Sequence, residues 1–404
     1  MINSSFRNRL MPAVFLSVFF IAFPNQIFTQ TAQPNLQIHA KCAVLMDALS
    51  GQVLFEHDPR LKIAPASFVK LLTLYIAFDA IRGGNLKIDD QVTVSQKAWR
   101  IGGSKMFIKP GEKVKVEDLL KGIAVVAGND ACVALAEYIT ASEDAFVLEM
   151  NKKAKLLGLN DSQFKNPHGL PVRDQYTTAL DITILARRYI QDHPEALVTH
   201  SLKEFEYHGI LQQNRNTLLR KNIGVDGLMT GYLAESGYHL VATAKRGDQR
   251  MITVVMGCDT SRKRVLEAQK LLEYGFKNFS TVLAVKKSDS FGPEKVVRGK
   301  PNKVHLIPGE EAWVTVAKGK ENSISVISDV PKPITAPVQK GQVLGKVLIQ
   351  SEGKVLKEVA LLSSSDIPEG FYLPWQLIGA GILSLTLVGL IMFWLMRRSK
   401  RKKF

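Results

Sequence analysis

The alternation of apolar and polar residues predicts a β-hairpin early in the chain and helices after it. In the segment CAVLMDALSGQVLFEHD, which begins at Cys42, two short apolar stretches flank a Ser-Gly pair, as in two strands joined by a tight turn. Residues 67–81 (SFVKLLTLYIAFDAI) and 116–138 are apolar at helical spacing, and the second stretch is interrupted near Gly128. We therefore expect an N-terminal hairpin followed by a helical region.

Alternating stretches return later and complete the predicted architecture. Residues 237–244 (GYHLVATA) and 251–257 (MITVVMG) read as a second antiparallel hairpin. Strands at both ends of a region with helices between them predict one α+β domain, over residues 36–278, whose terminal strands share a sheet. Residues 281–370 contain many short β-like stretches and turn residues, which predicts a small all-β domain of the sandwich type.

The N-terminus has the pattern of a secretory signal. Arg7 and Arg9 precede an apolar run that ends at Phe23, so the charged and apolar regions of a signal peptide are both present. We expect residues 1–30 to be a signal peptide, with an uncleaved anchor as the alternative.

The C-terminus has the pattern of a membrane anchor. Residues 375–396 are 22 positions without a charge, enough for a helix to cross about 30 Å of hydrocarbon, and tryptophans lie near both ends. Residues 397–404 are basic, which predicts a cytoplasmic tail and an outward-facing body. A helix lying on the membrane surface would need a polar face, and this segment has none.

Composition and charge narrow the function classes. With 46% apolar and 22% charged residues in 404, the chain is globular rather than disordered. The net charge is +16, but six of the positive charges lie in the last eight residues, and subtracting them leaves +10. No basic stripe interleaved with aromatic residues stands out, so we expect no nucleic-acid partner. Three cysteines without ligand spacing predict neither a disulfide framework nor a metal site.

Ser67 and Lys70 are the first candidates for chemistry. A spacing of three at the start of a helix places both side chains on one face, so the amine can take the proton of the hydroxyl. On its own, the pair fits an N-cap serine followed by a solvated lysine better than a catalytic pair. Residues 127–129 (AGN) and 229–231 (MTG) add two segments at the distances expected of a three-element site.

Longer motifs around these segments resemble the serine-type D-alanyl-D-alanine carboxypeptidases, the low-molecular-mass penicillin-binding proteins. The resemblance spans nearly the whole chain and implies a β-lactamase/transpeptidase-like domain, an antiparallel sheet with helices, followed by the small all-β domain. The motifs are GSKMFIKPGEKVKVEDLLKGIAVVAGNDACVALAEYI, FKNPHGLP, TALDITILAR, QNRNTLL, VDGLMTGYLAESGYHLVATAKR, PVQKGQVLGKVLI and DIPEGFY.

The resemblance implies a role for each matching position. Ser67 is the expected acyl-ester nucleophile and Lys70 its general base, with the N–H of Ser67 and one after Gly231 forming an oxyanion hole. Asn129 is expected to hold the substrate peptide and the lysine. Thr230 and Gly231 are expected on the strand beside which the substrate lies.

Three positions depart from the family pattern. Ala127 stands where the family has a serine that helps to pass a proton to the leaving amine. Met229, the first residue of the segment 229–231, stands where the family has a lysine near the substrate carboxylate. Tyr232 stands where histidine is frequent. Each of the first two losses could lower the rate about 10²-fold, so we expect a weak enzyme.

Other polar residues carry two interpretations each. Asp181 resembles a position near the deacylation water, but a helix N-terminal carboxylate explains it equally. His168 is expected in a turn and His239 in a strand. Cys132 and Cys258 are expected to be small buried hydrophobes.

The resemblance implies an enzyme that trims the terminal D-alanine from peptidoglycan pentapeptides, without a metal or cofactor. Its partners would be stem peptides and, as covalent inhibitors, β-lactams. It would sit in the bacterial cytoplasmic membrane by a single span, with its catalytic domain on the extracytoplasmic side. The alternatives are a catalytically impaired cell-wall binding or scaffold protein, and a β-lactamase, which would not normally carry the β-domain and anchor.

Overall fold

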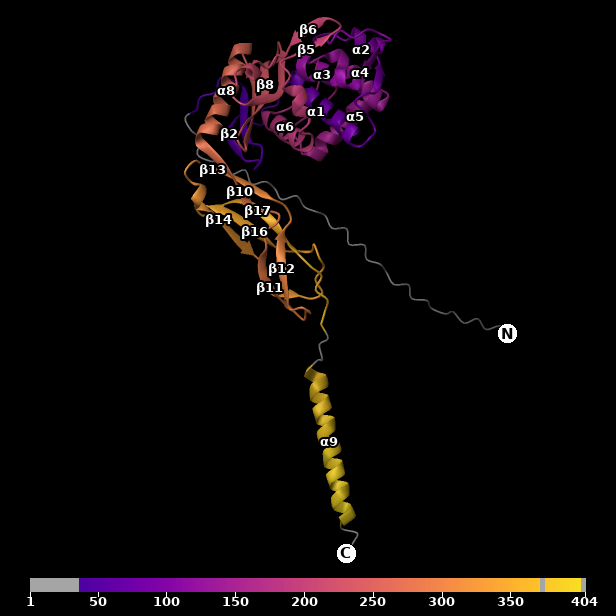
Figure 1. Ribbon diagram of the computed structural model, residues 1–404, viewed down its shortest axis with the longest axis vertical. Coiled ribbons are helices and arrows are strands. Elements are labelled where there is room, and N and C mark those ends of the chain that lie inside the picture. Colours follow the sequence, from indigo (N-terminus) through magenta and orange to yellow (C-terminus); the bar gives the residue numbers. More distant parts are fainter. Residues whose placement is uncertain (1–35, 371–374, 401–404) are drawn as a thin grey trace, which may run out of the picture.

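The computed structural model describes residues 36–370 and 375–400, which form two domains and a C-terminal helix (Figure 1). The predicted signal peptide, residues 1–30, lies outside the described residues.

A five-stranded antiparallel sheet organises the N-terminal domain. Its strand order is β2-β1-β9-β8-β7, so the predicted N-terminal hairpin and the later hairpin do share one sheet. The bounds are β1 Cys42–Asp47, β2 Val53–His57, β7 Val225–Leu233, β8 Gly237–Arg246 and β9 Gln249–Cys258.

Both faces of this sheet are covered, which explains why β1 is apolar at successive positions. Val44 belongs to the core between the sheet and most of the helices, whereas its neighbour Leu45 belongs to the core under helix α8 on the other face (Figure 1). The longer helices are α1 Val69–Arg82, α3 Val116–Val126, α4 Asn129–Thr140, α5 Glu143–Leu157, α6 Ala179–Asp192 and α8 Ser261–Asn278.

Short elements fill the connections. They are η1 Ala66–Phe68, β3 Gln91–Thr93, α2 Gln96–Arg100, β4 Lys113–Lys115, α7 Ala196–His200, β5 Glu204–Tyr207, β6 Ile210–Gln213 and η2 Thr217–Arg220.

The second domain is all-β apart from the single 3-10 turn η3 (Glu321–Ser323), as its short alternating stretches predicted. A six-stranded sheet of order β14-β16-β17-β12-β11-β15 and a two-stranded sheet of β10 and β13 enclose one apolar core. The strands are β10 Phe279–Val285, β11 Phe291–Val297, β12 Lys303–Pro308, β13 Ala312–Ala317, β14 Ile324–Asp329, β15 Ile334–Thr335, β16 Val343–Ser351 and β17 Lys354–Ser363.

The two domains are joined without a linker. Helix α8 ends at Asn278 and β10 begins at the next residue. The buried carboxylate of Asp47, on β1, accepts from the Thr281 hydroxyl at 2.5 Å, and the hydroxyls of Ser50 and Thr315 lie 2.7 Å apart. Side chains of both domains therefore share one hydrogen-bonded joint.

The C-terminal helix α9 (Trp375–Lys400) covers the predicted anchor. Its stretch Gly379–Met396 is long and apolar enough to cross a membrane, and none of it is buried against the rest of the described chain. The helix continues four residues beyond the predicted span, into the basic tail.

Candidate active site

Ser67 lies in a strained turn at the entrance to a buried helix. It is the middle residue of η1, which leads directly into α1, and its side chain is half-buried. Ala66, just before it, has a φ of 50°, a left-handed conformation that costs a residue with a Cβ roughly 1–2 kcal/mol. The turn therefore presents the Ser67 hydroxyl at a position that the packing of η1 and α1 determines.

Lys70 lies one turn later and is only 1% exposed. Its Nζ atom is 3.3 Å from Ser67 Oγ, as the spacing of three predicts. Burial lowers the pKa of Lys70 to about 8, because a charged amine loses its hydration; the charge of Arg215 also lowers it, and Asp130 acts in the opposite direction. The amine is therefore suited to act as a base near neutral pH.

The loop 166–170 (NPHGL) packs against this pair. The carbonyl oxygen of His168 accepts a hydrogen bond from Lys70 Nζ, and that of Pro167 accepts from Thr73 Oγ1 at 2.7 Å. Gly169 has a φ of 83°, and a Cβ there would lie 1.8 Å from the Ala66 carbonyl oxygen. Only glycine allows the loop to approach the turn at Ala66 and Ser67 this closely.

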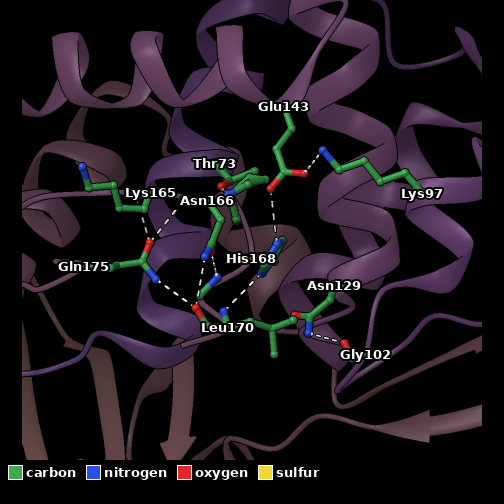
Figure 2. Close-up of polar contacts among 12 residues, drawn as sticks. Thr73, Lys97, Gly102, Asn129, Glu143, Lys165, Asn166, His168, Leu170 and Gln175 are labelled. Atoms are coloured by element: carbon green, nitrogen blue, oxygen red, sulfur yellow. Dashed lines mark hydrogen bonds and ion pairs between the residues drawn. The ribbon is translucent and has the colours of Figure 1, made fainter. Parts of the chain in front are cut away.

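Asn129 begins α4, and Ala127 and Gly128 separate that helix from α3, as the interrupted pattern predicted. The Asn129 side chain is 4% exposed and its Nδ2 donates to the Gly102 carbonyl at 2.7 Å (Figure 2). Its backbone N–H donates to Ser104 O at 2.7 Å. These two bonds attach Asn129 to the loop that contains Gly102 and Ser104. Its contact with a substrate stays a prediction.

Asp130, the next residue, was not singled out from the sequence. Its buried carboxylate accepts from the backbone N–H groups of Met106 at 2.8 Å and Phe107 at 2.9 Å. These bonds hold the same loop that Asn129 contacts, so two neighbouring side chains set its position.

Strand β7 places residues 229–231, the third predicted segment, beside the turn that contains Ala66 and Ser67. β7 is the edge strand of the sheet, so its outer backbone groups can pair with an extended peptide. A Cβ on Gly231 would lie 3.1 Å from Ala66 Cβ and 3.4 Å from Ser67 N. The close approach of the two backbones places the Ser67 N–H beside the residues that follow Gly231, as an oxyanion hole requires.

Met229 and Ala127 are both buried, at 2% and 3% exposed, in the core cluster that lies between the helices and the sheet. Ala127 ends α3 in a left-handed conformation with a φ of 58°. The two departures therefore replace polar groups of the family pattern with apolar side chains inside one core.

Two arginines lie near the site, and neither was identified from the sequence. Arg264, on α8, is 8% exposed and donates to the Gly231 carbonyl at 2.9 Å. The charge of Arg215 lowers the pKa of both Lys70 and Arg264, after burial as the largest cause, so it lies near both.

The two residues beside Arg215 explain how it is presented. Asn214 and Asn216 are buried; Asn214 Nδ2 donates to Leu202 O at 2.8 Å, and Asn216 Nδ2 donates to Gly227 O at 3.0 Å. The exposed arginine is thus held between two anchored amides. An Asn-Arg-Asn sequence in the motif QNRNTLL was the signal that could have identified it.

The contacts of Asp181 fit its second interpretation, that of a helix N-terminal carboxylate. It lies in the first turn of α6, where the N-cap Thr178 accepts from its backbone N–H. Its carboxylate accepts from Ser162 Oγ at 2.6 Å and from the Asp161 N–H at 2.9 Å, and burial raises its pKa. These contacts are those of a helix N-terminal carboxylate, and a role near the deacylation water stays a prediction.

The remaining polar candidates lie where the pattern placed them. His239 is a buried residue of β8; its Nδ1 accepts from the Gly257 N–H at 2.9 Å, and burial lowers its pKa to about 4. His168 lies in a bend and is buried. The cysteines are free and buried. Within the part of the chain that the structure describes, no group of three or more His, Cys, Asp or Glu side chains could hold a metal ion.

Two family models match the chain. The one described as D-alanyl-D-alanine carboxypeptidase matches residues 28–260, and the one described as penicillin-binding protein 5, C-terminal domain, matches residues 279–369.

Individual relatives and solved structures agree with these matches. The chain is 39% identical to D-alanyl-D-alanine carboxypeptidase DacC of Escherichia coli over 87% of this chain and 90% of that protein, and 34% identical to DacF of Bacillus subtilis over 90% and 96%. The crystal structure of penicillin-binding protein 5 from Haemophilus influenzae matches with a TM-score of 0.81 and 38% identity, over 84% of this chain and 100% of that one. An ampicillin-bound penicillin-binding protein of Listeria monocytogenes matches with a TM-score of 0.56 and 30% identity, over 60% and 100%. The comparison confirms the predicted fold class.

The pKa of Lys70 predicts how reaction at Ser67 depends on pH. Only the neutral amine can accept the hydroxyl proton, so acylation by a fluorescent penicillin should rise about tenfold per pH unit and level off near pH 8. Second-order labelling rates measured from about pH 5.5 to 11 test this. A rate that still rises above pH 10 would assign Lys70 an ordinary pKa, and a flat profile would exclude it as the base.

Proposed function

This chain belongs to the D-alanyl-D-alanine carboxypeptidase family, and we propose that it removes the terminal D-alanine from peptidoglycan pentapeptides through an acyl-enzyme on Ser67. The observation that carries the proposal is the desolvated Lys70 amine 3.3 Å from Ser67 Oγ. Membership of the family confirms the resemblance seen in the motifs.

The proposed acylation uses groups that this chain supplies. Lys70 takes the proton of Ser67 Oγ, which attacks the carbonyl carbon of the terminal D-Ala-D-Ala bond. The oxyanion that forms is held by the Ser67 N–H and the N–H of Tyr232, which follows Gly231. The peptide C–N bond then breaks, the amine of the leaving D-alanine receives a proton, and the rest of the peptide stays as an ester on Ser67.

Deacylation returns the enzyme. A water molecule attacks the ester carbonyl, Lys70 takes one of its protons, and the Ser67 oxygen leaves with a proton restored. A β-lactam would acylate Ser67 in the same way, because its strained amide presents a carbonyl to the same groups. The ampicillin-bound relative from Listeria monocytogenes supports this partner class.

Arg215 is our candidate for the cation that Met229 does not provide. The substrate ends in a carboxylate, and a charge-assisted contact to it is worth about 1.5–3 kcal/mol. Arg215 is exposed and near enough to Lys70 to affect its pKa, whereas Met229 is buried in the apolar core. The carboxylate contact is then kept, by an arginine.

Ala127 leaves the proton transfer to the leaving amine without the family's hydroxyl. We therefore keep the expectation of slow turnover. If turnover is lost altogether, the protein has the alternative function: a cell-wall binding protein that is acylated or binds stem peptides without turning them over.

Helix α9 suggests a membrane anchor. We propose that it spans the bacterial cytoplasmic membrane once, with both domains on the extracytoplasmic side, because the six basic residues that follow its apolar stretch favour the cytoplasm.

Ser67→Ala tests the nucleophile. A fluorescent penicillin should label the native protein and not the Ser67→Ala variant, because no ester can form without the hydroxyl. Ser328→Ala, at an exposed position on β14, should be labelled like the native protein. In the same experiment, release of D-alanine from a diacyl-D-Ala-D-Ala peptide measures turnover. Labelling of Ser67→Ala would place the nucleophile elsewhere, and a labelled native protein without turnover would favour the binding function.

Arg215→Ala tests the carboxylate contact. We expect kcat/KM on the same peptide to fall about ten- to a hundredfold, mainly through KM, whereas Arg262→Ala, an exposed arginine on α8, should change it little. Met229→Lys should bring no gain in the native background but restore part of the loss in the Arg215→Ala background. A tenfold gain from Met229→Lys alone would contradict the assignment, since it would show that the carboxylate had no cation.

Truncation before Trp375 tests the anchor. The shortened protein should be recovered in the soluble extracytoplasmic fraction, because a membrane-spanning helix holds a protein far more strongly than a surface contact. Fractionation followed by a salt wash measures this. A shortened protein that stays in the membrane would mean that the N-terminal segment is an uncleaved anchor.

A further inference from the structure

We propose that Glu143 is a positioning residue for the Lys70 amine and that it acts through His168. The inference rests on the proposed roles of Ser67 and Lys70. It adds a group, 76 residues away from the nucleophile in the chain, that touches neither reacting atoms nor substrate.

A polar chain runs from Lys97 through Glu143 to His168 behind the site, and its last two members are largely buried (Figure 2). Glu143 is the first residue of α5, and its side chain is 10% exposed. One carboxylate oxygen lies 3.4 Å from Nε2 of His168, which is 6% exposed, and the other lies 2.7 Å from Nζ of Lys97. The contact with His168 is the largest cause that holds the pKa of Glu143 below its usual range, so Glu143 is a carboxylate.

The hydrogen bonds of His168 define its tautomer. Nδ1 accepts from the Leu170 N–H at 3.2 Å, so it carries a lone pair and no proton. The ring is then neutral, its one proton is on Nε2, and that proton points at Glu143. Glu143 therefore accepts the only side-chain hydrogen bond that His168 can donate.

His168 transmits this contact to the catalytic amine. Its carbonyl oxygen accepts from Lys70 Nζ, which is also 3.3 Å from Ser67 Oγ. A neutral amine has two N–H bonds and one lone pair, so donating one N–H to His168 leaves only two staggered positions for the lone pair. Tilting the His168 peptide would turn the lone pair away from the hydroxyl and slow the proton transfer.

Other contacts hold the fold of the loop, so the role of Glu143 is narrower than stability. Asn166 Oδ1 accepts from the Gly169 N–H at 2.6 Å, and Gln175 Nε2 donates to Leu170 O at 3.2 Å (Figure 2). These bonds lie on either side of His168 and do not involve Glu143. The His168–Gly169 peptide carries both the Gly169 N–H that donates to Asn166 and the carbonyl that accepts from Lys70, so Asn166 fixes one side of this peptide. What Glu143 adds is the orientation of the His168 ring, which restrains the other side.

Variants of Glu143 test the proposal in the full chain. We expect Glu143→Ala to lower the limiting rate of acylation by a fluorescent penicillin about ten- to a hundredfold, with the half-saturating concentration within about twofold of the native value. Glu143→Gln keeps an oxygen acceptor for the Nε2 proton and should acylate within about threefold of the native rate. Glu149→Ala, on the same helix and half-exposed, is the matched control and should react like the native protein.

Several results would overturn the inference. They are a native acylation rate in Glu143→Ala, a change confined to the half-saturating concentration, and a Glu143→Gln variant as slow as Glu143→Ala. If thermal melting shows that Glu143→Ala does not fold, Glu143→Leu fills the same volume and carries the same expectation. Native protein that is not labelled would instead refute the proposed function, so the two failures are distinguishable.

Discussion

The burial of the Lys70 amine is the constraint on which the arrangement of the N-terminal domain depends. An ammonium group taken out of water costs several kcal/mol unless it is paired, and Lys70 forms no ion pair among the described residues. The amine is therefore pushed toward its neutral form. Cys132 and Asp130 act in the opposite direction on the pKa of Lys70. The Asp130 carboxylate is bonded by backbone N–H groups, and burial raises the pKa of the Cys132 thiol to about 12. An apolar Met229 belongs to the same interior.

The base and the proposed cation of the site differ in their exposure to water. The amine and its nearest apolar neighbours lie inside, whereas Arg215, our proposed partner for the substrate carboxylate, lies at the exposed rim. Its charge still reaches the base, because it is one of the causes that lower the pKa of Lys70. In the family pattern a lysine occupies the position of Met229, so under the proposed function this chain provides the cation from a different residue.

Sequence patterns were sufficient for elements whose apolar residues repeat locally. The hairpin of β1 and β2, the helices around Ser67 and Asn129, and the all-β domain were all predicted. β7 was not recognised from periodicity, because its glycines interrupt the alternation and its buried positions are consecutive. His168 was expected in a turn, but its contact with Glu143 was not predicted, because Glu143 lies 25 residues earlier and no local pattern connects them. Arg215 was missed for the same reason: its significance depends on Lys70, which lies far away in the chain.

The joint between the domains has a mechanical meaning. Because β10 follows α8 without an intervening residue, and Thr281 donates across the joint to Asp47, rotation of the β-domain relative to the sheet that carries β1 would break a partly buried hydrogen bond. The joint therefore resists such rotation. The direction from which a polymer strand can reach Ser67 then depends on the placement of the β-domain as well as on the groups around the reacting atoms.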